Sequence, residues 1–159
     1  MVKKNAYIVL GLGYGDEGKG LTTDFLCSKY ENAIVIRFNG GHQAGHTVVH
    51  KNYSHIFSSF GSGTLRNRPT YWSKYCTFSP FYFIEELEIL PIKPIIFIDK
   101  KCPITTHYDI LFNRSLEITR GSENLGSCGV GFGATVDREK DGLNFHFSDI
   151  YYDEKIDEK

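Results

Sequence analysis

The sequence lacks long hydrophobic runs and lacks an excess of charge of either sign. No stretch of about 18 apolar residues occurs, which argues against a membrane-spanning helix, and the apolar stretch near the N-terminus is too short for a signal peptide. Lys and Arg number 18 and Asp and Glu number 19, so the basic excess typical of nucleic-acid or anionic-membrane binders is missing. We therefore expect a cytoplasmic protein that binds neither nucleic acid nor membranes.

Cysteine is also sparse, and the four cysteines are widely separated. Cys27, Cys76, Cys102 and Cys128 form no C-x-x-C pair, which speaks against a structural zinc site or a secreted disulfide framework. We expect buried free thiols. Hydrophobic residues make up 41% of the 159 residues, enough for one globular domain with a core. The acidic and basic residues of 151–159 predict a charged tail or the end of a truncated sequence.

Hydrophobic patterning predicts an α/β fold. An apolar run at 6–10, helical spacing at 19–30 and a second apolar run at 33–38 indicate a strand, a helix and a strand paired in parallel. Residues 46–50 and 53–57 predict a hairpin. Farther on, we expect a helix that starts at Ser79-Pro80, a strand at 94–98, and a helix from Thr105 or Thr106 toward Gly121.

A glycine loop follows the first predicted strand. Residues 13–19, GYGDEGK, fit both the phosphate loop G-x-x-x-x-G-K and the dinucleotide pattern G-x-G-x-x-G. The dinucleotide interpretation requires an acidic residue after the second strand, where the chain has Arg37-Phe38-Asn39-Gly40. Gly20 replaces the hydroxyl that holds magnesium in phosphate loops, so Asp16 becomes the candidate metal ligand. The alternative is a tight turn with a solvated aspartate and lysine.

A histidine segment, NGGHQAGHT at 39–47, follows the second predicted strand and should face the same edge of the sheet as the loop. His42, His46 and His50 are spaced by four, as zinc ligands on a helix would be, although three glycines disfavour that helix. Three interpretations stay open: a metal trio, a histidine that pairs with backbone groups, and a histidine kept charged beside phosphate.

Together, GYGDEGKG at 13–20 and NGGHQAGHT at 39–47 resemble the nucleotide-site motifs of the adenylosuccinate synthetase family of GTP-dependent ligases. The resemblance continues through HIFSSFGSG at 55–63 and GSCGVGFGA at 126–134. It implies an α/β fold built on a mainly parallel sheet. Family members are longer, so residues 1–150 correspond to an N-terminal part of the domain. The guanine-recognising motif and the aspartate-binding loop would lie beyond residue 159.

The resemblance also implies roles for individual residues. Asp16 would be the catalytic base and His46 the acid, and Mg²⁺ would be held by Asp16 and the carbonyl of Gly45. The implied GTP-binding residues are Gly15, Asp16, Glu17, Gly18, Lys19, Gly20, Gly45, His46 and Thr47. The implied IMP-binding residues are Asp16, Lys19, Gln43, Ala44, Gly45, His46 and Cys128. The substrates would be GTP, IMP and L-aspartate, and the complete enzyme would be a homodimer.

Several positions depart from the family pattern. Gln43 replaces an Asn, Cys128 a Thr and Val130 an Arg, and Lys140-Asp141 stands where the family has an arginine pair. Loss of arginines weakens bidentate phosphate recognition. Two alternatives therefore accompany the ligation of aspartate to IMP. One is a magnesium-dependent ligase that acts on another purine nucleotide, and the other is a catalytically inactive nucleotide-binding remnant.

Overall fold

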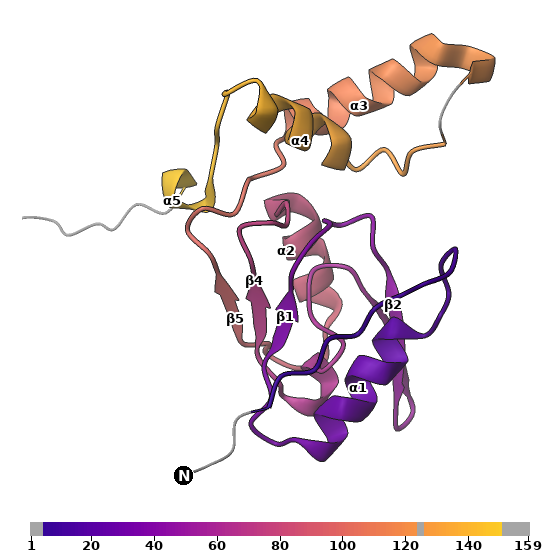
Figure 1. Cartoon of the computed structure of the whole chain (residues 1–159), viewed down its shortest axis with the longest axis vertical. Helices are drawn as coiled ribbons and strands as arrows, with labels where there is room; N and C mark the ends of the chain where they lie inside the picture. Colours follow the sequence, from indigo (N-terminus) through magenta and orange to yellow (C-terminus); the bar gives the residue numbers. More distant parts are fainter. Residues whose placement is uncertain (1–4, 124–125, 151–159) are drawn as a thin grey trace, which may run out of the picture.

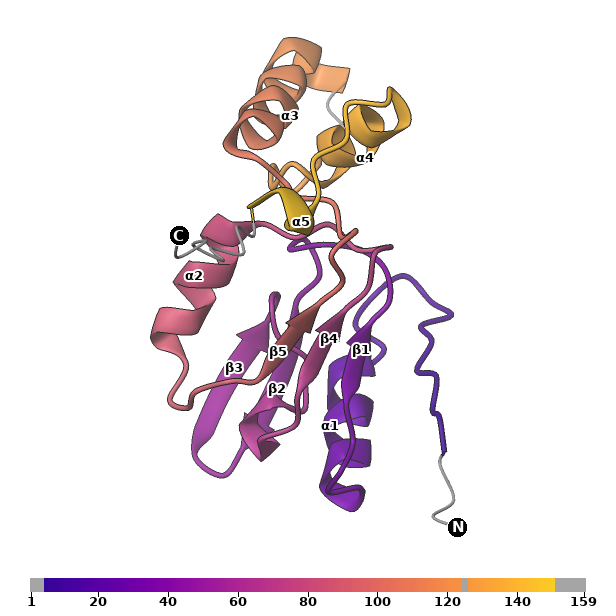
Figure 2. The ribbon, with the colours of Figure 1, turned by 90° about the vertical axis from the view of Figure 1, so that its left-hand side faces the viewer.

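The structure, a computed structural model, describes residues 5–123 and 126–150. Its centre is a parallel sheet of β1 (Val35–Arg37), β4 (Thr70–Trp72) and β5 (Ile96–Ile98), in the order β1-β4-β5. Figure 2 shows these strands side by side, pointing the same way. The predicted α/β class with a mainly parallel sheet is confirmed.

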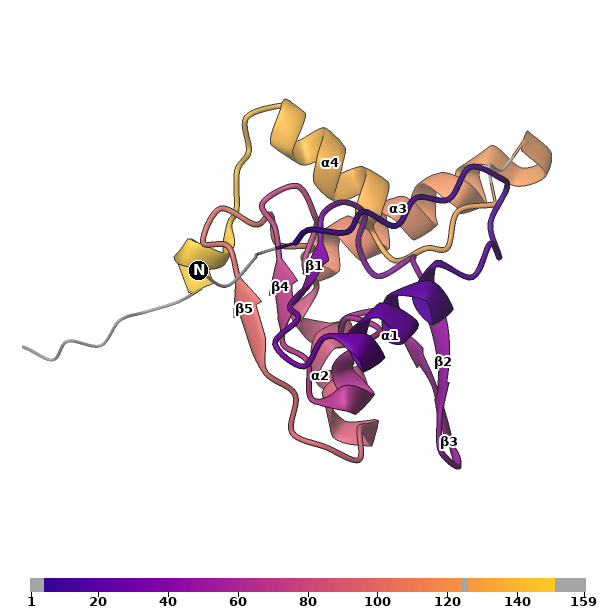
Figure 3. The same ribbon diagram turned by 60° about the horizontal axis from the view of Figure 1, so that its bottom comes forward.

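One face of the sheet is covered, and no helix or strand of the described residues covers the other (Figures 1 and 2). The covering elements are α1 (Lys19–Lys29), α2 (Pro80–Ile89), and the antiparallel hairpin of β2 (His46–His50) and β3 (Tyr53–Phe57). The predicted hairpin is confirmed, and so are the helices predicted to start at residue 19 and at Ser79-Pro80. Figure 3 shows α1 lying alongside β2, which brings the start of the helix next to the start of the strand.

A helical layer lies beyond the carboxyl ends of the parallel strands (Figures 1 and 2). It consists of α3 (His107–Arg120), α4 (Phe132–Lys140) and the short α5 (Phe147–Ile150), while 3₁₀ turns η1 (Thr64–Arg66) and η2 (Gly121–Glu123) complete the connections. The predicted helix from Thr105 or Thr106 is confirmed as α3. The Thr106 side chain accepts from the Asp109 N–H and the Asp109 carboxylate accepts from the Thr106 N–H, a capping box.

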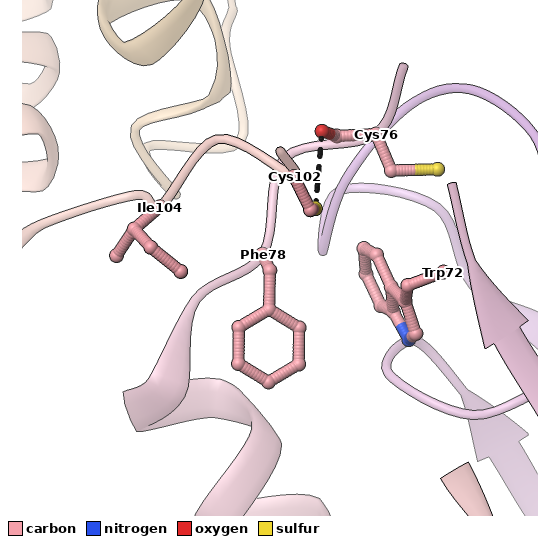
Figure 4. Packing of buried hydrophobic residues seen from close by; sticks show 5 residues of the cluster. All are labelled: Trp72, Cys76, Phe78, Cys102 and Ile104. Atoms are coloured by element: carbon pink, nitrogen blue, oxygen red, sulfur yellow. Dashed lines mark hydrogen bonds between the residues drawn. The ribbon is translucent and has the colours of Figure 1, made fainter. Parts of the chain in front are cut away.

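The core consists of two buried clusters. Val48 and Phe57 of the hairpin and Phe60 form the smaller one, which packs against Phe83 of α2 and Ile96 of β5. Trp72, Cys76, Phe78, Cys102 and Ile104 form one buried cluster, shown in Figure 4, in which the Cys102 thiol donates to the Cys76 carbonyl at 3.5 Å. The Trp72 indole N–H donates to the Ser59 carbonyl at 2.7 Å, which satisfies the only polar atom of that buried side chain.

Three of the four cysteines are buried free thiols, as expected. The fourth, Cys128, is exposed in the loop before α4, so the expectation of burial was wrong for that residue. A buried environment raises the pKa of the Cys27 and Cys76 thiols, because desolvation disfavours the thiolate.

The strand predicted at residues 6–10 is wrong. This segment forms no strand, and Ile8 and Leu10 are 83% and 72% exposed. Within the described residues, Tyr7 makes the side-chain contact of this segment with the rest of the fold. Its ring stacks on that of Tyr30, and the two hydroxyl groups are hydrogen-bonded. A strand needs a neighbour for its backbone groups, and no described strand offers one here. The expected parallel pairing of 6–10 with 33–38 is therefore replaced by the pairing of β1 with β4.

The sequence interpretation also missed β4, α4, the short α5 and the two 3₁₀ turns. β4 follows the Asn67-Arg68-Pro69 turn and occupies the centre of the sheet, and α4 begins inside the glycine-rich segment 126–134. The helix predicted at 19–30 and the strands predicted at 33–38 and 94–98 are confirmed in shorter form. The charged segment 151–159 lies outside the described residues.

Candidate functional site

The glycine loop turns directly into α1. Gly15, Asp16 and Gly18 have φ values of 114°, 56° and 76°, a left-handed conformation that glycine adopts without strain and that aspartate tolerates. Gly18 is the N-cap of α1 and, because it lacks a side chain, leaves the first N–H groups of the helix without a side-chain cap. The first N–H groups of the helix and the positive end of its dipole are therefore presented to whatever lies in front of the loop.

The carboxylate of Glu17 lies in the curve of the loop. Its Oε1 accepts from the N–H of Gly13 at 2.9 Å and of Gly15 at 3.2 Å, and its Oε2 accepts from Lys19 Nζ at 2.6 Å. These donors, the Lys19 ammonium first, lower the pKa of Glu17 to about 2. The structure therefore shows that the loop gathers donors around an anionic group.

Asp16 stands apart from that network. It is exposed, and within residues 5–123 and 126–150 its carboxylate takes part in no hydrogen bond or ion pair. Its carboxylate is therefore available for an external cation or proton. The described residues contain no group of three or more His, Cys, Asp or Glu side chains that could hold a metal by themselves.

The glycine loop and the histidine segment meet at Gly20 and His46. Gly20 is buried, and a Cβ placed on it would lie 2.7 Å from His46 Cβ and 3.3 Å from His46 Cα. Only glycine allows this approach of α1 to β2. The sequence prediction that the two segments face one site is supported by this contact, which also gives a steric reason for the absence of a Ser or Thr at position 20.

His46 is half-buried and its pKa lies below the ordinary value. Burial is the main cause, and the Arg37 and Lys19 cations add to it. In the absence of an anion the imidazole is therefore held neutral near pH 7. The sequence interpretation has a charged histidine beside phosphate, and that protonation depends on the negative charge of the phosphate opposing these two cations.

His42 has a structural role. Its Nε2 accepts from the Ser79 N–H at 3.1 Å, so the proton is on Nδ1, which lies 3.2 Å from Ser59 Oγ and can donate to it. The ring stacks on Trp72 with centroids 5.5 Å apart. Burial, followed by the Arg37 charge, lowers the His42 pKa to about 3. Of the three interpretations of the histidine segment, pairing with backbone groups fits His42, and no metal trio with His46 and His50 forms among the described residues.

Arg37 is a site residue that the sequence reasoning did not select. Its guanidinium lies 4.5 Å from the centroid of the Trp72 ring, and Nη2 donates to the Gly41 carbonyl at 3.1 Å. It is buried at the carboxyl end of β1 and acts on His42 and His46 by its charge. The sequence signal was a charged residue that ends an apolar strand, a position where burial of the charge requires a reason.

The segment 126–134 reaches the histidine segment through Phe132. A Cβ on Gly41 would lie 3.1 Å from Phe132 Cδ2, so the start of α4 packs closely on this turn. Ala44 N–H donates to the Gly41 carbonyl at 3.4 Å, which closes the turn around Gln43. No hydrogen bond joins Cys128 to Asp16, Lys19 or His46 within the described ranges. Of the predicted site residues, Gly20 and His46 are in contact across the two segments, whereas Cys128 has no such link to Asp16, Lys19 or His46 among the described residues.

Comparison with known proteins identifies the family to which this chain belongs. A sequence profile described as adenylosuccinate synthetase matches residues 8–159. The chain belongs to the adenylosuccinate synthetase family. The adenylosuccinate synthetase of Borrelia duttonii is 39% identical over 130 residues, which cover 80% of this chain and 30% of that protein. The chain thus spans about a third of the length of the curated adenylosuccinate synthetases it matches.

Solved structures of this family and of a related phage enzyme show the same fold. A fully ligated adenylosuccinate synthetase from Plasmodium falciparum superposes with a TM-score of 0.79 at 23% identity, covering 87% of this chain and 34% of that one. The succinoaminodeoxyadenylate synthetase of cyanophage S-2L, bound to dGMP and dATP, matches with a TM-score of 0.62 at 18% identity, over 85% and 38% of the two chains. Within its described part, this adenylosuccinate synthetase homologue has no helix of the length and apolarity needed to cross a bilayer.

Proposed function

We propose that this chain carries the phosphoryl-transfer half of a GTP-dependent ligase that joins L-aspartate to IMP and gives adenylosuccinate. The family membership supports the reaction class. The observation that carries the proposal is the contact of Gly20 with His46, because it places the phosphate loop and the histidine segment against each other. Phosphoryl transfer requires mainly positioning and charge neutralisation, and these two segments supply both.

The proposed reaction has two steps. Asp16 takes the N1 proton of IMP, and the O6 of the nucleotide then attacks the γ-phosphorus of GTP while the bond to GDP breaks. The amino group of aspartate next attacks C6, and the phosphate leaves with O6. Protonated His46 stabilises the charge on the transferring phosphoryl group, and Lys19 and the start of α1 hold phosphate oxygens.

The residues present suit a magnesium ion. Mg²⁺ is commonly bound by one or two protein oxygens together with substrate phosphates and water. The Asp16 carboxylate, which has no partner among the described residues, and the carbonyl of the exposed residue Gly45 match such a donor set. Bound there, Mg²⁺ would neutralise phosphate charge.

A different purine acceptor is the second candidate. Gln43, Cys128 and Val130 depart from the family pattern on the acceptor side. The cyanophage enzyme of similar fold was solved with dGMP and dATP, so the shared scaffold accommodates other nucleotides in that protein. Homodimerisation and a cytoplasmic location stay predictions in either case.

Titration of the folded chain with Mg²⁺ and GTP tests the proposal. We expect weak, magnesium-dependent binding, because the family resemblance implies a guanine-recognising motif that these 159 residues do not include. Lys19→Ala should remove most of that binding, since it deletes the cationic side chain of the loop. Absence of binding by protein shown to be folded by circular dichroism would contradict the site assignment.

A further inference from the structure

Three donors of the glycine loop converge on one carboxylate of the same chain. The N–H groups of Gly13 and Gly15 point to Glu17 Oε1, and the Lys19 ammonium points to Oε2. Backbone N–H groups and one lysine around an anion are the arrangement that phosphate loops offer to a phosphate. In this structure a side chain of the loop itself takes that position.

The pair formed by Glu17 and Lys19 lies close to Gly11, which precedes the loop. A Cβ on Gly11 would lie 2.5 Å from Lys19 Nζ and 2.8 Å from Glu17 Oε2. Lys19 is thus folded back over the loop, with its ammonium fixed by Glu17, while the neighbouring Asp16 carboxylate takes no part in this network. The two adjacent acids therefore occupy different environments.

We propose that the Glu17 carboxylate is an internal occupant of the phosphate position, which keeps the loop and Lys19 in the binding shape and is displaced when a polyphosphate enters. This inference rests on the proposed function, because it concerns the same loop. No covalent bond changes in the exchange. One set of hydrogen bonds and one ion pair are replaced by another set with the same donors.

The exchange gives Glu17 a role in selectivity. A polyphosphate presents several charged oxygens to the donors and competes well against one carboxylate, whereas a singly charged anion gains little by replacing another. Glu17 therefore lowers the affinity of the loop for every anion and leaves only highly charged ones able to bind. The ligand class selected is a di- or triphosphate group.

Calorimetric titration with inorganic tripolyphosphate, which lacks a base and a ribose, tests this role. Glu17→Gln keeps the size of the side chain, removes its charge and turns an amide toward Lys19. We expect it to bind tripolyphosphate about 10-fold more tightly than the wild type, the scale of one charge-assisted hydrogen bond in a partly exposed site. Glu31→Gln, an exposed acid beyond the end of α1, changes the net charge equally and should leave affinity within about twofold.

Equal or weaker binding by Glu17→Gln would overturn the inference, and so would absence of tripolyphosphate binding in every variant. A second measurement needs no affinity: in ¹⁵N NMR spectra, Glu17→Gln should shift the amide resonances of Gly13 and Gly15, and tripolyphosphate should shift the same resonances in the wild type. Unchanged resonances would also overturn it. The proposed ligase function fails separately, if tripolyphosphate binds as expected and Mg²⁺ with GTP and the acceptor gives no reaction in the complete enzyme.

Discussion

At the scale of single residues, the small size of Gly20 allows the glycine loop to contact the histidine segment. A methyl group there would meet His46 Cβ at 2.7 Å and the His46 backbone at 3.3 Å, and neither atom can rotate away. We expect Gly20→Ala to lower the free energy of unfolding by about 1–3 kcal/mol, the usual cost of overpacking. It should also weaken nucleotide binding. Urea unfolding followed by circular dichroism measures the first effect.

Gly133 provides the matched control. It also lies in a helix, α4, and a Cβ there would meet nothing within 4 Å. Gly133→Ala should raise the free energy of unfolding by about 0.5–1 kcal/mol, through helix propensity. Equal effects of the two substitutions would contradict the close approach of α1 to His46.

Substitutions of Asp16 and of His46 in the complete enzyme are expected to lower turnover to different extents. Asp16→Asn should abolish turnover, because it removes a proton acceptor and a charged oxygen ligand together. His46→Asn should lower kcat by about 10²- to 10⁴-fold with a smaller effect on nucleotide binding, if the residue acts mainly in the transition state. Steady-state kinetics separate the two. Full activity of the His46 variant would eliminate its proposed role.

At the scale of elements, His42 couples the histidine segment to α2 and the sheet. The unfolded chain binds a proton at His42 near pH 6.5, while the folded protein does so only near pH 3. Protons therefore favour the unfolded state between these values, and stability falls as pH falls. Between these two pKa values, the titration of His42 lowers the free energy of unfolding by up to about 1.4 kcal/mol for each pH unit of acidification.

In the window from pH 7.5 to 5.5 ordinary carboxylates stay ionised, but His46, whose pKa burial also lowers, contributes to the same decline. The difference between the wild type and His42→Gln therefore measures the contribution of His42. We expect the free energy of unfolding to decline over that window, and to decline less in His42→Gln, which retains an acceptor for the Ser79 N–H and does not titrate. A decline of the same slope in both proteins would show that His42 is not the group responsible.

The elements that the sequence predicted are those whose signal is local. Thr106 and Asp109 form a capping box, and Ser79-Pro80 starts α2, because caps depend on a few neighbouring residues. The strand expected at 6–10 failed because a strand depends on a partner elsewhere in the chain. β4 was missed for the same reason: Thr70–Trp72 is short, and its position between β1 and β5 is set by pairing.

The site shows the same division. The motifs located Asp16, Lys19 and His46, since their residue types and spacing are distinctive. The position of the Glu17 carboxylate inside the loop could not be predicted, because it depends on three-dimensional contacts. For Arg37 the sequence offered only its place at the end of an apolar strand, and its contacts with Gly41 and Trp72 appear only in the structure. The neutral state of His46 in the absence of phosphate likewise follows from burial.

At the scale of the whole molecule, one face of the sheet is left uncovered by the helices and strands of residues 5–123 and 126–150. Ile36, Tyr71 and Phe97 are aligned across β1, β4 and β5, and Ile36 and Phe97 are 62% and 53% exposed. Surface of this kind is normally covered by another element or partner. The matched relatives are about three times as long as this chain.

We therefore expect the polypeptide of residues 1–159 to form no adenylosuccinate at a measurable rate by itself. The family resemblance places the aspartate-binding loop outside this sequence, and an unpositioned amine forfeits an orientation advantage of up to about 7–11 kcal/mol. An assay with IMP, aspartate, GTP and Mg²⁺ on monodisperse protein, following phosphate release and ultraviolet absorbance, measures this. An ordinary enzymatic rate would show that an aspartate site lies within these residues.

The most direct test of the shared phosphate site is an NMR titration of the chain with Mg²⁺ and GTP. The account predicts that the amides of Gly13, Gly15 and Gly20 and the imidazole of His46 shift together, with one dissociation constant, and that Lys19→Ala weakens all four responses equally. Shifts of the loop glycines without His46, or saturation of the two at different concentrations, would contradict a single site formed by both segments.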